Sequence, residues 1–294
     1  MTPKPVAGDA VLSFREGGPG RLSVLPIAPR PPVVGAASRI LEHRAVGYHY
    51  MHLELESPEI ASVALPGQFV MLTAATGGSP VPALPRPMAI YSTDVERGAV
   101  TVVYAVIGRG TRRLSDFPVG ESMYMVGPLG RGFEIPTTAR SVLLIGRGIG
   151  TCSLTTVAQH NRLHGIDTIA VTSGRSPAAV VGADFFRDQG AVEVLEVTDE
   201  DGSSDPGALS ARLTASLDRN PPQLILTCGS DRLALLSTTL AGRWGAEVQV
   251  SLEAHMACGI GYCHGCSSGA PADAAETPLV CKDGPVFALS TTIA

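Results

Sequence analysis

The sequence lacks the features that mark several common functional classes. No segment reaches the roughly 18 uninterrupted apolar residues of a membrane-spanning helix, because Gly, Pro, Thr or Arg interrupts each run. Lys4 and Lys282 are the only lysines, and the formal net charge of −5 leaves no basic stripe for a phosphate backbone. Neither a P-loop nor a Ser-His-Asp pattern is present. We therefore expect neither a membrane nor a nucleic acid as a partner.

The cysteines indicate redox or metal chemistry. Residues 1–8 contain one lysine but no compact apolar segment followed by small residues, so they do not resemble a secretory signal, and we expect a cytoplasmic protein. Of the six cysteines, Cys152 and Cys228 stand alone, whereas the other four lie close together near the carboxyl terminus. In a reducing compartment, such clustering indicates metal or catalytic chemistry rather than disulfide bonds.

The pattern of apolar residues divides the chain into four regions. Residues 1–32 are rich in Gly and Pro, which predicts a flexible arm. Residues 33–137 contain short β-like runs, typical of a small antiparallel barrel or sandwich. Residues 138–252 alternate apolar strands and helices, which predicts a parallel α/β sheet, and residues 253–294 form a lobe rich in Cys and Gly. The expected strands cover residues 50–55, 68–73, 100–107, 142–145, 168–172, 191–197, 223–228 and 247–252, and the expected helices cover residues 153–164, 207–217 and 231–242.

The strongest motif is a set of four cysteines. Cys258, Cys263 and Cys266 have the spacing C-x4-C-x2-C, and Cys281 follows after fourteen intervening residues. This is the opening spacing of plant-type [2Fe–2S] clusters, which carry one electron at a time. Glycines between the cysteines let backbone N–H groups approach the sulfur atoms. Zinc also binds four thiolates, but its ligands usually come as two separate short pairs. The spacing therefore favours an iron–sulfur cluster over a structural zinc site.

A glycine-rich loop follows an apolar run near the middle of the chain. Gly146, Gly148 and Gly150 lie between an expected strand and an expected helix, where a turn without side chains can approach a pyrophosphate. The Gly-x-Gly-x-x-Gly spacing of the ordinary dinucleotide fingerprint is absent. The loop therefore indicates either a different nucleotide-binding fold or close packing without a ligand.

A third motif combines an arginine with a second glycine loop. Arg86 precedes Pro87 at an expected strand edge, and Gly110 and Thr111 follow the strand at residues 100–107. An arginine in this setting can clamp a diphosphate while the loop holds the other side. Each feature alone is equally typical of a hairpin with a surface arginine. The hypothesis gains weight because a one-electron cluster needs a cofactor that also exchanges electron pairs.

Taken in order, these motifs resemble the electron-transfer subunit of the NAD-linked dihydroorotate dehydrogenases, a branch of the ferredoxin–NADP reductase superfamily. The resemblance covers nearly everything after about Val33. Its most specific part is the cysteine segment, in which Lys-Asp-Gly-Pro follows Cys281. The other matching segments are residues 66–70, 86–87, 108–111, 127–133, 144–150, 228–229, 253–259 and 280–287.

The resemblance implies an FAD-binding β-barrel at residues 33–137, a NAD(P)-binding α/β domain at 138–252 and a [2Fe–2S] lobe at 253–294. The residues that it implies for the cluster are Cys258, Cys263, Cys266 and Cys281. Those for FAD are Arg86, Pro87, Met88, Ala89, Val103, Tyr104, Ala105, Gly110 and Thr111. Those for the nicotinamide nucleotide are Gly146, Gly148, Ile149, Gly150, Arg175, Cys228 and Gly229. The implied partner is a catalytic FMN-type flavoprotein of pyrimidine biosynthesis, in a heterotetramer.

The chain also departs from the family pattern. Ala89 stands where the family usually has a Ser or Thr, Arg147 interrupts the glycine triplet, and Ser230 replaces a proline. These differences leave open a diaphorase subunit of a hydrogenase or of a specialised-metabolism reductase. They also leave open a redox-sensing regulator and a non-enzymatic, zinc-stabilised binding protein. The choice between NAD and NADP and the direction of electron flow are open as well.

Overall fold

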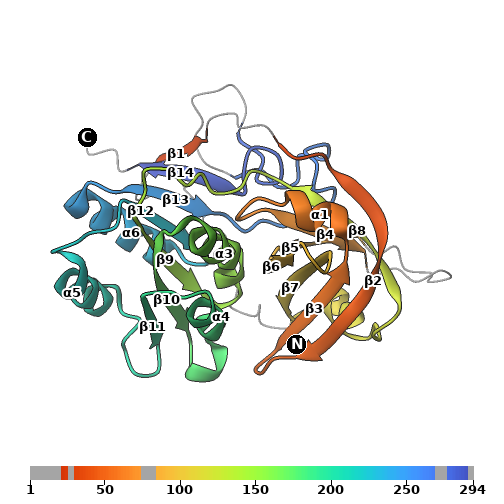
Figure 1. Cartoon of the computed structure of the whole chain (residues 1–294), viewed down its shortest axis with the longest axis horizontal. Helices are drawn as coiled ribbons and strands as arrows, with labels where there is room; N and C mark the ends of the chain where they lie inside the picture. The colour runs from red at the N-terminus through yellow and green to blue at the C-terminus, as the bar shows by residue number, and fades with distance from the viewer. Residues whose placement is uncertain (1–20, 26–29, 74–83, 269–276, 291–294) are drawn as a thin grey trace, which may run out of the picture.

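The computed structural model describes residues 21–25, 30–73, 84–268 and 277–290, which form two seven-stranded sheets side by side (Figure 1). Within these residues, no helix is both long and apolar enough to cross a bilayer. All the strands and helices expected from the sequence overlap observed elements. The two-sheet architecture is therefore confirmed.

The first sheet is antiparallel and has the order β5-β4-β8-β2-β3-β7-β6. Its edge strands β5 and β6 are separated by only two residues, so the sheet has to curl into a barrel. The curled sheet encloses a core in which Leu53, Leu55, Val70 and Val102 are fully buried. Its elements are β2 (Val34–Ala45), β3 (Tyr50–Glu56), α1 (Pro58–Val63), β4 (Phe69–Thr73), β5 (Arg86–Ala89), β6 (Ser92–Asp94), β7 (Ala99–Ala105), α2 (Arg109–Ser115) and β8 (Ser122–Leu129).

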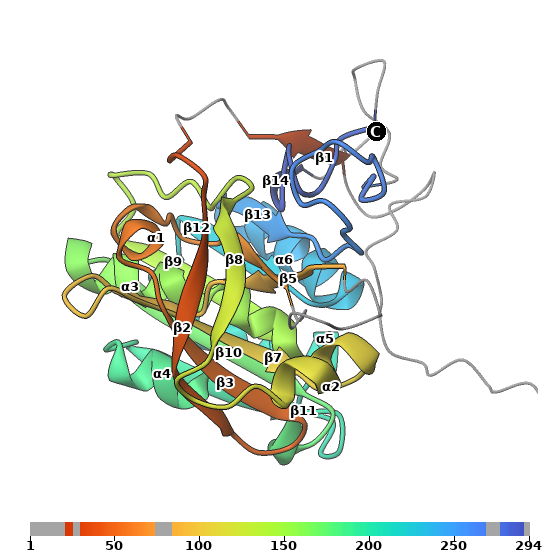
Figure 2. The ribbon, with the colours of Figure 1, turned by 90° about the vertical axis from the view of Figure 1, so that its right-hand side faces the viewer.

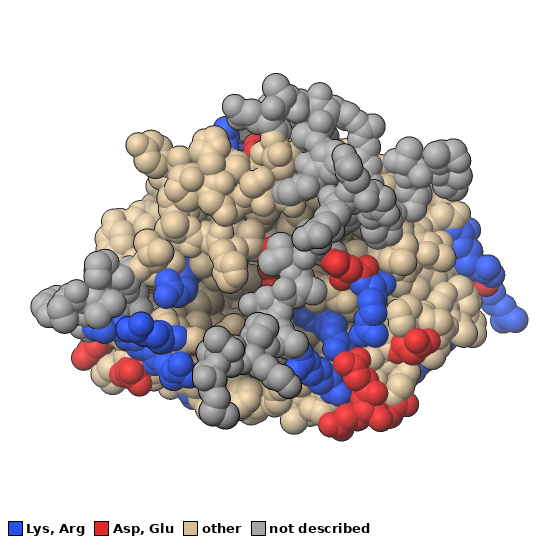
Figure 3. Space-filling view, turned by 180° about the vertical axis from the view of Figure 1, so that it is seen from behind, with Lys and Arg blue, Asp and Glu red and all other residues tan. Residues whose placement is uncertain are grey.

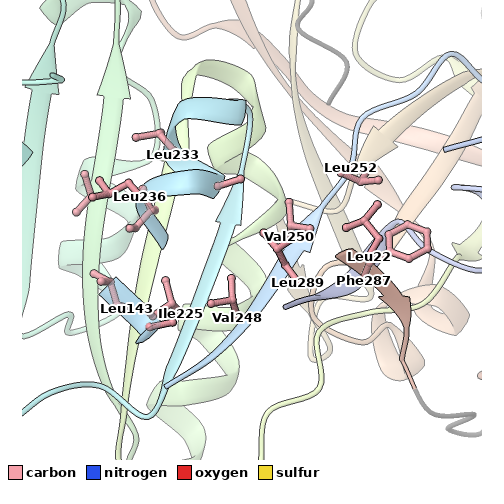
Figure 4. Close-up of a cluster of buried hydrophobic side chains, with 14 of the residues drawn as sticks. Leu22, Leu143, Ile225, Leu233, Leu236, Val248, Val250, Leu252, Phe287 and Leu289 are labelled. Atoms are coloured by element: carbon pink, nitrogen blue, oxygen red, sulfur yellow. The ribbon is translucent and has the colours of Figure 1, made fainter. Parts of the chain in front are cut away.

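The second sheet has a parallel centre, β13-β12-β9-β10-β11. Alternate residues of β9 face opposite layers: Leu143 and Ile145 pack in one core with α5 and α6, while Val142 and Leu144 pack in another with α3 and α4 (Figures 1 and 4). Its elements are β9 (Ser141–Arg147), α3 (Thr155–His164), β10 (Asp167–Gly174), α4 (Ala183–Asp188), β11 (Glu193–Thr198), α5 (Pro206–Leu217), β12 (Leu224–Cys228), α6 (Asp231–Trp244) and β13 (Glu247–Ser251).

The strand order of this sheet defines where a ligand is expected. The chain moves outward from β9 to β10 and β11, and then returns to the other side of β9 with β12 and β13. In open α/β sheets, ligands bind at the carboxyl ends of the strands where the order reverses. That point lies between β9 and β12, on the side that faces the barrel (Figure 1).

Both ends of the described chain contribute strands to one side of the second sheet. Strand β14 (Val286–Ser290) pairs antiparallel with β13, and β1 (Arg21–Val24) pairs antiparallel with β14. The prediction of a flexible arm at residues 1–32 is therefore wrong for Arg21–Val24, while residues 1–20 and 26–29 lie outside the described residues. Leu22 is buried against the sheet, which is a tertiary contact that no local pattern in this Gly- and Pro-rich region predicts. Figure 2 shows the carboxyl-terminal segment in blue beside β14, above the barrel strands.

Candidate functional site

A cavity of about 310 Å³ lies between the barrel and the carboxyl ends of the parallel strands. Strands β5 and β7 line one side, and the loops after β9, β12 and β13 line the other. This volume is typical of a small-molecule site, and such sites often occur where two domains meet. The predicted cofactor residues that line the cavity are Arg86, Pro87, Met88, Ala89, Val103, Tyr104, Ala105, Thr111, Ile149, Gly150 and Cys228.

Arg86 is held against the first turn of α2. A Cβ atom added to Gly110 would lie 2.3 Å from both Nε and Nη2 of Arg86, so the guanidinium occupies space that only a glycine leaves open. Nη1 of Arg86 donates a hydrogen bond to the carbonyl oxygen of Leu84 at 2.6 Å. Gly110 does not line the cavity itself but allows Arg86 to reach it. A fixed guanidinium at the wall of a cavity fits a diphosphate.

Thr111 and Tyr104 shape the cavity through contacts elsewhere. The Thr111 hydroxyl oxygen accepts hydrogen bonds from the N–H groups of Ile107 and Gly108, each at 3.1 Å, so it fixes the start of α2. The Tyr104 side chain belongs to the barrel core, and its hydroxyl lies 2.8 Å from Nε2 of His43. Because burial raises the pKa of Tyr104, the phenol stays protonated. Both hydroxyl groups are therefore engaged by hydrogen bonds within the protein.

Close contacts surround three of the predicted glycines, and two of them, Gly150 and Gly229, allow the loops after β9 and β12 to touch. A Cβ on Gly150 would lie 2.8 Å from Cα of Gly229, and a Cβ on Gly229 would lie 2.5 Å from the carbonyl oxygen of Arg147. A Cβ on Gly146 would lie 2.5 Å from Oγ1 of Thr151. Of the predicted glycines in these two loops, only Gly150 lines the cavity. For Gly146 and Gly229 the structure therefore supports close backbone packing.

Gly229→Ala is expected to destabilise the protein. Gly229 has φ of +101°, and the added methyl group would meet the Arg147 carbonyl, so the substitution costs about 1–3 kcal/mol of unfolding free energy. Thermal unfolding followed by circular dichroism measures the loss. Gly242→Ala is the matched control, because Gly242 lies in α6 with no atom within 4 Å of an added Cβ. An unchanged melting temperature in Gly229→Ala would contradict the packing argument.

The sequence did not predict a cluster of charged side chains that lies at the carboxyl ends of β9, β10 and β11. Nη1 and Nη2 of Arg147 lie 3.2 Å and 2.6 Å from the two carboxylate oxygens of Asp199, and Nη1 also donates to Ser173 at 2.9 Å. Hydrogen bonds from Arg147 and Ser204 hold the pKa of Asp199 at about 2. Arg232 lies 3.5 Å from the same carboxylate. Figure 3 shows the face opposite to that of Figure 1, where basic and acidic side chains lie next to one another on the surface.

Arg175 lies outside the cavity. It follows β10, and its carbonyl oxygen accepts a hydrogen bond from the N–H group of Glu200 at 3.2 Å. The predicted contact of Arg175 with the nicotinamide nucleotide therefore has no support from the lining of the cavity, although this residue lies on the same sheet edge as Arg147. The sequence signal that could have identified Asp199 is the position of this carboxylate just after the strand expected at residues 191–197.

The four clustered cysteines fall into two pairs. The sulfur atoms of Cys266 and Cys281 lie 3.1 Å apart, and the N–H group of Cys263 donates to the sulfur of Cys258 at 3.4 Å. In the described part of the chain, no three His, Cys, Asp or Glu side chains surround one point suited to a single ion. A [2Fe–2S] cluster takes four thiolates shared between two irons, whereas zinc draws its four ligands around one ion. The paired arrangement therefore fits the binuclear cluster better.

Backbone N–H groups point at these sulfur atoms. Gly261 donates to the sulfur of Cys281 at 3.0 Å, and Cys281 donates to that of Cys266 at 3.4 Å. Burial opposes the thiolate of Cys258, but hydrogen bonds from the N–H groups of Cys263 and Ile260 outweigh it and lower the pKa of Cys258 to about 6. Such donors stabilise the negative charge of metal-bound thiolates. These N–H donors therefore suit thiolate ligands, although burial raises the pKa of Cys281 to about 12.

The cavity and the cysteine loop are continuous along the chain. Ser251, Glu253 and Met256 line the cavity, and Cys258 follows two residues after Met256. A Cβ on Gly259 would lie 2.6 Å from Cγ of Met71, so the loop rests on barrel strand β4. Sequence reasoning did not assign Glu253 or Met256 to the site, although they lie directly after the last parallel strand. A cofactor in the cavity and a cluster in the loop would thus be close neighbours.

Comparisons with known proteins agree with this geometry. The family model for the iron–sulfur cluster binding domain of dihydroorotate dehydrogenase B matches residues 253–292. The chain is 30% identical over 253 residues to the dihydroorotate dehydrogenase B (NAD(+)) electron transfer subunit of Geobacillus kaustophilus, covering 84% of this chain and 94% of the relative. Its counterpart from Listeria monocytogenes is 32% identical over 224 residues, which cover 76% and 85%.

Solved structures share the fold. A chain of the NADH-dependent reduced ferredoxin-NADP oxidoreductase superposes with a TM-score of 0.70 and 25% identity, over 87% of this chain and 90% of that one. Phthalate dioxygenase reductase superposes with a TM-score of 0.52 and 17% identity, over 71% and 65%. At this identity, the second likeness concerns the fold alone. Together they establish a ferredoxin reductase-like architecture.

Proposed function

This chain belongs to the family of electron transfer subunits of dihydroorotate dehydrogenase B, and from that premise we propose that it passes electrons between a nicotinamide nucleotide, FAD and a [2Fe–2S] cluster. The cluster exchanges electrons with a catalytic flavoprotein subunit, in a heterotetramer. The observation that carries the proposal is the continuity between the cavity and the cysteine loop, from Ser251 to Cys258. FAD, when bound, supplies the exchange between an electron pair and single electrons.

The residues of this chain bind and orient the cofactors in this proposal. Arg86, seated on Gly110, holds the FAD diphosphate. Met88, Ala89 and Val103 line the cavity and exclude water from one side of it. The nicotinamide nucleotide enters from the opposite side, past Gly150 and the Arg147–Asp199 ion pair. The cysteines that hold the cluster are Cys258, Cys263, Cys266 and Cys281.

The proposed domain limits follow the sheets. Residues 33–137 form the FAD domain, and residues 138–252 form the nucleotide domain, whose sheet β14 and then β1 extend beyond β13. The proposed cluster lobe is residues 253–294, and its strand β14 joins the second sheet. The proposed nucleotide is NAD(H), because the relatives carry NAD(+) in their names. Anaerobic titration with NADH and with NADPH tests this choice, and reduction by NADPH alone would contradict it.

The partner is proposed to dock over the exposed edge of the cluster loop. Cys263 is exposed, and its neighbours Ile260 and Tyr262 have 60% and 86% of their surface exposed. Electron transfer requires the partner's redox group to approach this edge. A large aromatic side chain at such a position is typical of residues that dominate binding energy.

Tyr262→Ala is therefore expected to raise the Kd for a dihydroorotate dehydrogenase catalytic subunit by about tenfold or more. Surface plasmon resonance measures the Kd, and anaerobic stopped flow shows whether NADH still reduces the flavin at its original rate. Leu163→Ala is the control, because Leu163 is 82% exposed on α3. Equal affinities for the Tyr262→Ala variant and the unmodified chain would place the docking surface elsewhere.

A further inference from the structure

An arginine near the amino terminus reaches the cysteine segment. The guanidinium of Arg30 donates a hydrogen bond to the carbonyl oxygen of Lys282, the residue that follows Cys281. The charged neighbours that affect Arg30 include Cys281, Asp283 and Arg131. Arg30 and Cys281 are far apart in the sequence, so this proximity is a product of the fold.

The surrounding contacts fix this part of the chain against the cysteine segment. Strand β1 pairs with β14, and Nη1 of Arg131 donates to the carbonyl oxygen of Leu25 at 3.0 Å. The N–H group of Arg131 also donates to the carbonyl oxygen of Gly284 at 2.6 Å. Arg131 therefore links Leu25, five residues before Arg30, to Gly284, three residues after Cys281.

The charge of Arg30 has a direct electrostatic consequence. A [2Fe–2S] cluster bound by four thiolates is anionic, and its one-electron reduction adds a further negative charge without forming or breaking a bond. A nearby cation stabilises the reduced form more than the oxidised form. The carboxylate of Asp283 offsets part of the positive charge of Arg30, and its Oδ2 also accepts a hydrogen bond from the N–H group of Leu279 at 2.8 Å. Arg131 adds a second positive charge near Arg30.

We propose that Arg30 raises the reduction potential of the [2Fe–2S] cluster by holding a positive charge at the Lys282 carbonyl, beside Cys281. The inference rests on the proposed function, because it requires the cluster to be bound. Arg30 is a positioning residue in this role and touches no substrate. An arginine suits the task because its guanidinium stays protonated at all relevant pH values.

The test is an anaerobic redox titration of the purified holoprotein, with the cluster followed by electron paramagnetic resonance. Arg30→Gln removes the charge and keeps a hydrogen-bond donor, so at the wild-type midpoint the ratio of reduced to oxidised cluster is expected to fall about three- to tenfold. Arg30→Lys keeps the charge and is expected to stay within about twofold of wild type. The flavin midpoint, read from the visible spectrum, is expected to stay unchanged.

Arg39→Gln is the matched control, because Arg39 is an exposed barrel residue paired with Glu56, and its loss changes the net charge equally. An unchanged cluster midpoint in Arg30→Gln, with full iron and sulfide content, would overturn the inference. Equal shifts in Arg30→Gln and Arg30→Lys would also overturn it, as would loss of iron from both. A wild-type protein without iron and acid-labile sulfide would instead contradict the proposed function.

Discussion

Cys281→Ser is expected to abolish the [2Fe–2S] cluster and leave FAD bound. The sulfur of Cys281 is buried, lies 3.1 Å from that of Cys266 and accepts the N–H group of Gly261. A serine hydroxyl is a smaller and harder ligand that replaces this thiolate poorly, so the iron content is expected to fall from about two atoms per chain to near none. Electron delivery to the partner is expected to fall to background.

The measurement combines iron and acid-labile sulfide assays with the visible spectrum. Flavin absorbance and its bleaching by NADH are expected to persist in Cys281→Ser, because the residue does not line the cavity. Cys152→Ser is the matched control, since Cys152 is also a buried cysteine but lies against the cavity. Full iron content in Cys281→Ser would show that the cluster does not use this cysteine.

Arg86→Leu is expected to weaken FAD binding by roughly 10- to 100-fold, the value of a charge-assisted hydrogen bond to a phosphate. The side chain lines the cavity and is seated on Gly110, where a Cβ atom would lie 2.3 Å from its Nε. Gly110→Ala is therefore expected to displace the guanidinium and to weaken binding in the same direction. The release of FAD, followed by its fluorescence, measures both effects.

Two further variants separate the role of Arg86 from general charge effects. Arg86→Lys keeps the charge but loses the planar fork, so an intermediate affinity is expected. Arg112→Leu removes a neighbouring arginine of α2 that does not line the cavity, and it is expected to bind FAD normally. Equal FAD affinity in Arg86→Leu and in the unmodified chain would contradict the assignment of Arg86 to the diphosphate.

Local patterns were sufficient to predict the features that depend on neighbouring residues. The spacing of Cys258, Cys263 and Cys266 is a local property, and it predicted a loop in which the structure pairs Cys258 with Cys263 and Cys266 with Cys281. The apolar runs likewise predicted three barrel strands, β3, β4 and β7, and the five parallel strands of the second sheet, whereas β2, β6 and β8 of the barrel were not predicted. The assignment of residues at the ends of β9 and β12 to a nucleotide site came from the family resemblance, and the structure places both ends at the carboxyl edge of the parallel sheet.

Long-range pairing could not be predicted in the same way. Strand β1 forms because β14 offers an unpaired edge, and this edge exists only after the chain has folded. The ion pair between Arg147 and Asp199 joins the ends of two strands that are distant in sequence. Gly146 and Gly229 do not line the cavity, and each has a close neighbour that a side chain would meet, so their predicted contact with a nucleotide stays a prediction.

The central claim is that one chain holds both a flavin and a [2Fe–2S] cluster and that a nicotinamide nucleotide reduces both. The most direct test is an anaerobic visible and electron paramagnetic resonance spectrum of the purified protein, with iron, sulfide and FAD assays, before and after NADH is added. We predict flavin and cluster absorption that bleaches with NADH, together with the signal of a reduced cluster. A colourless protein that contains zinc, and stays colourless after anaerobic reconstitution with FAD, iron and sulfide, would contradict the account.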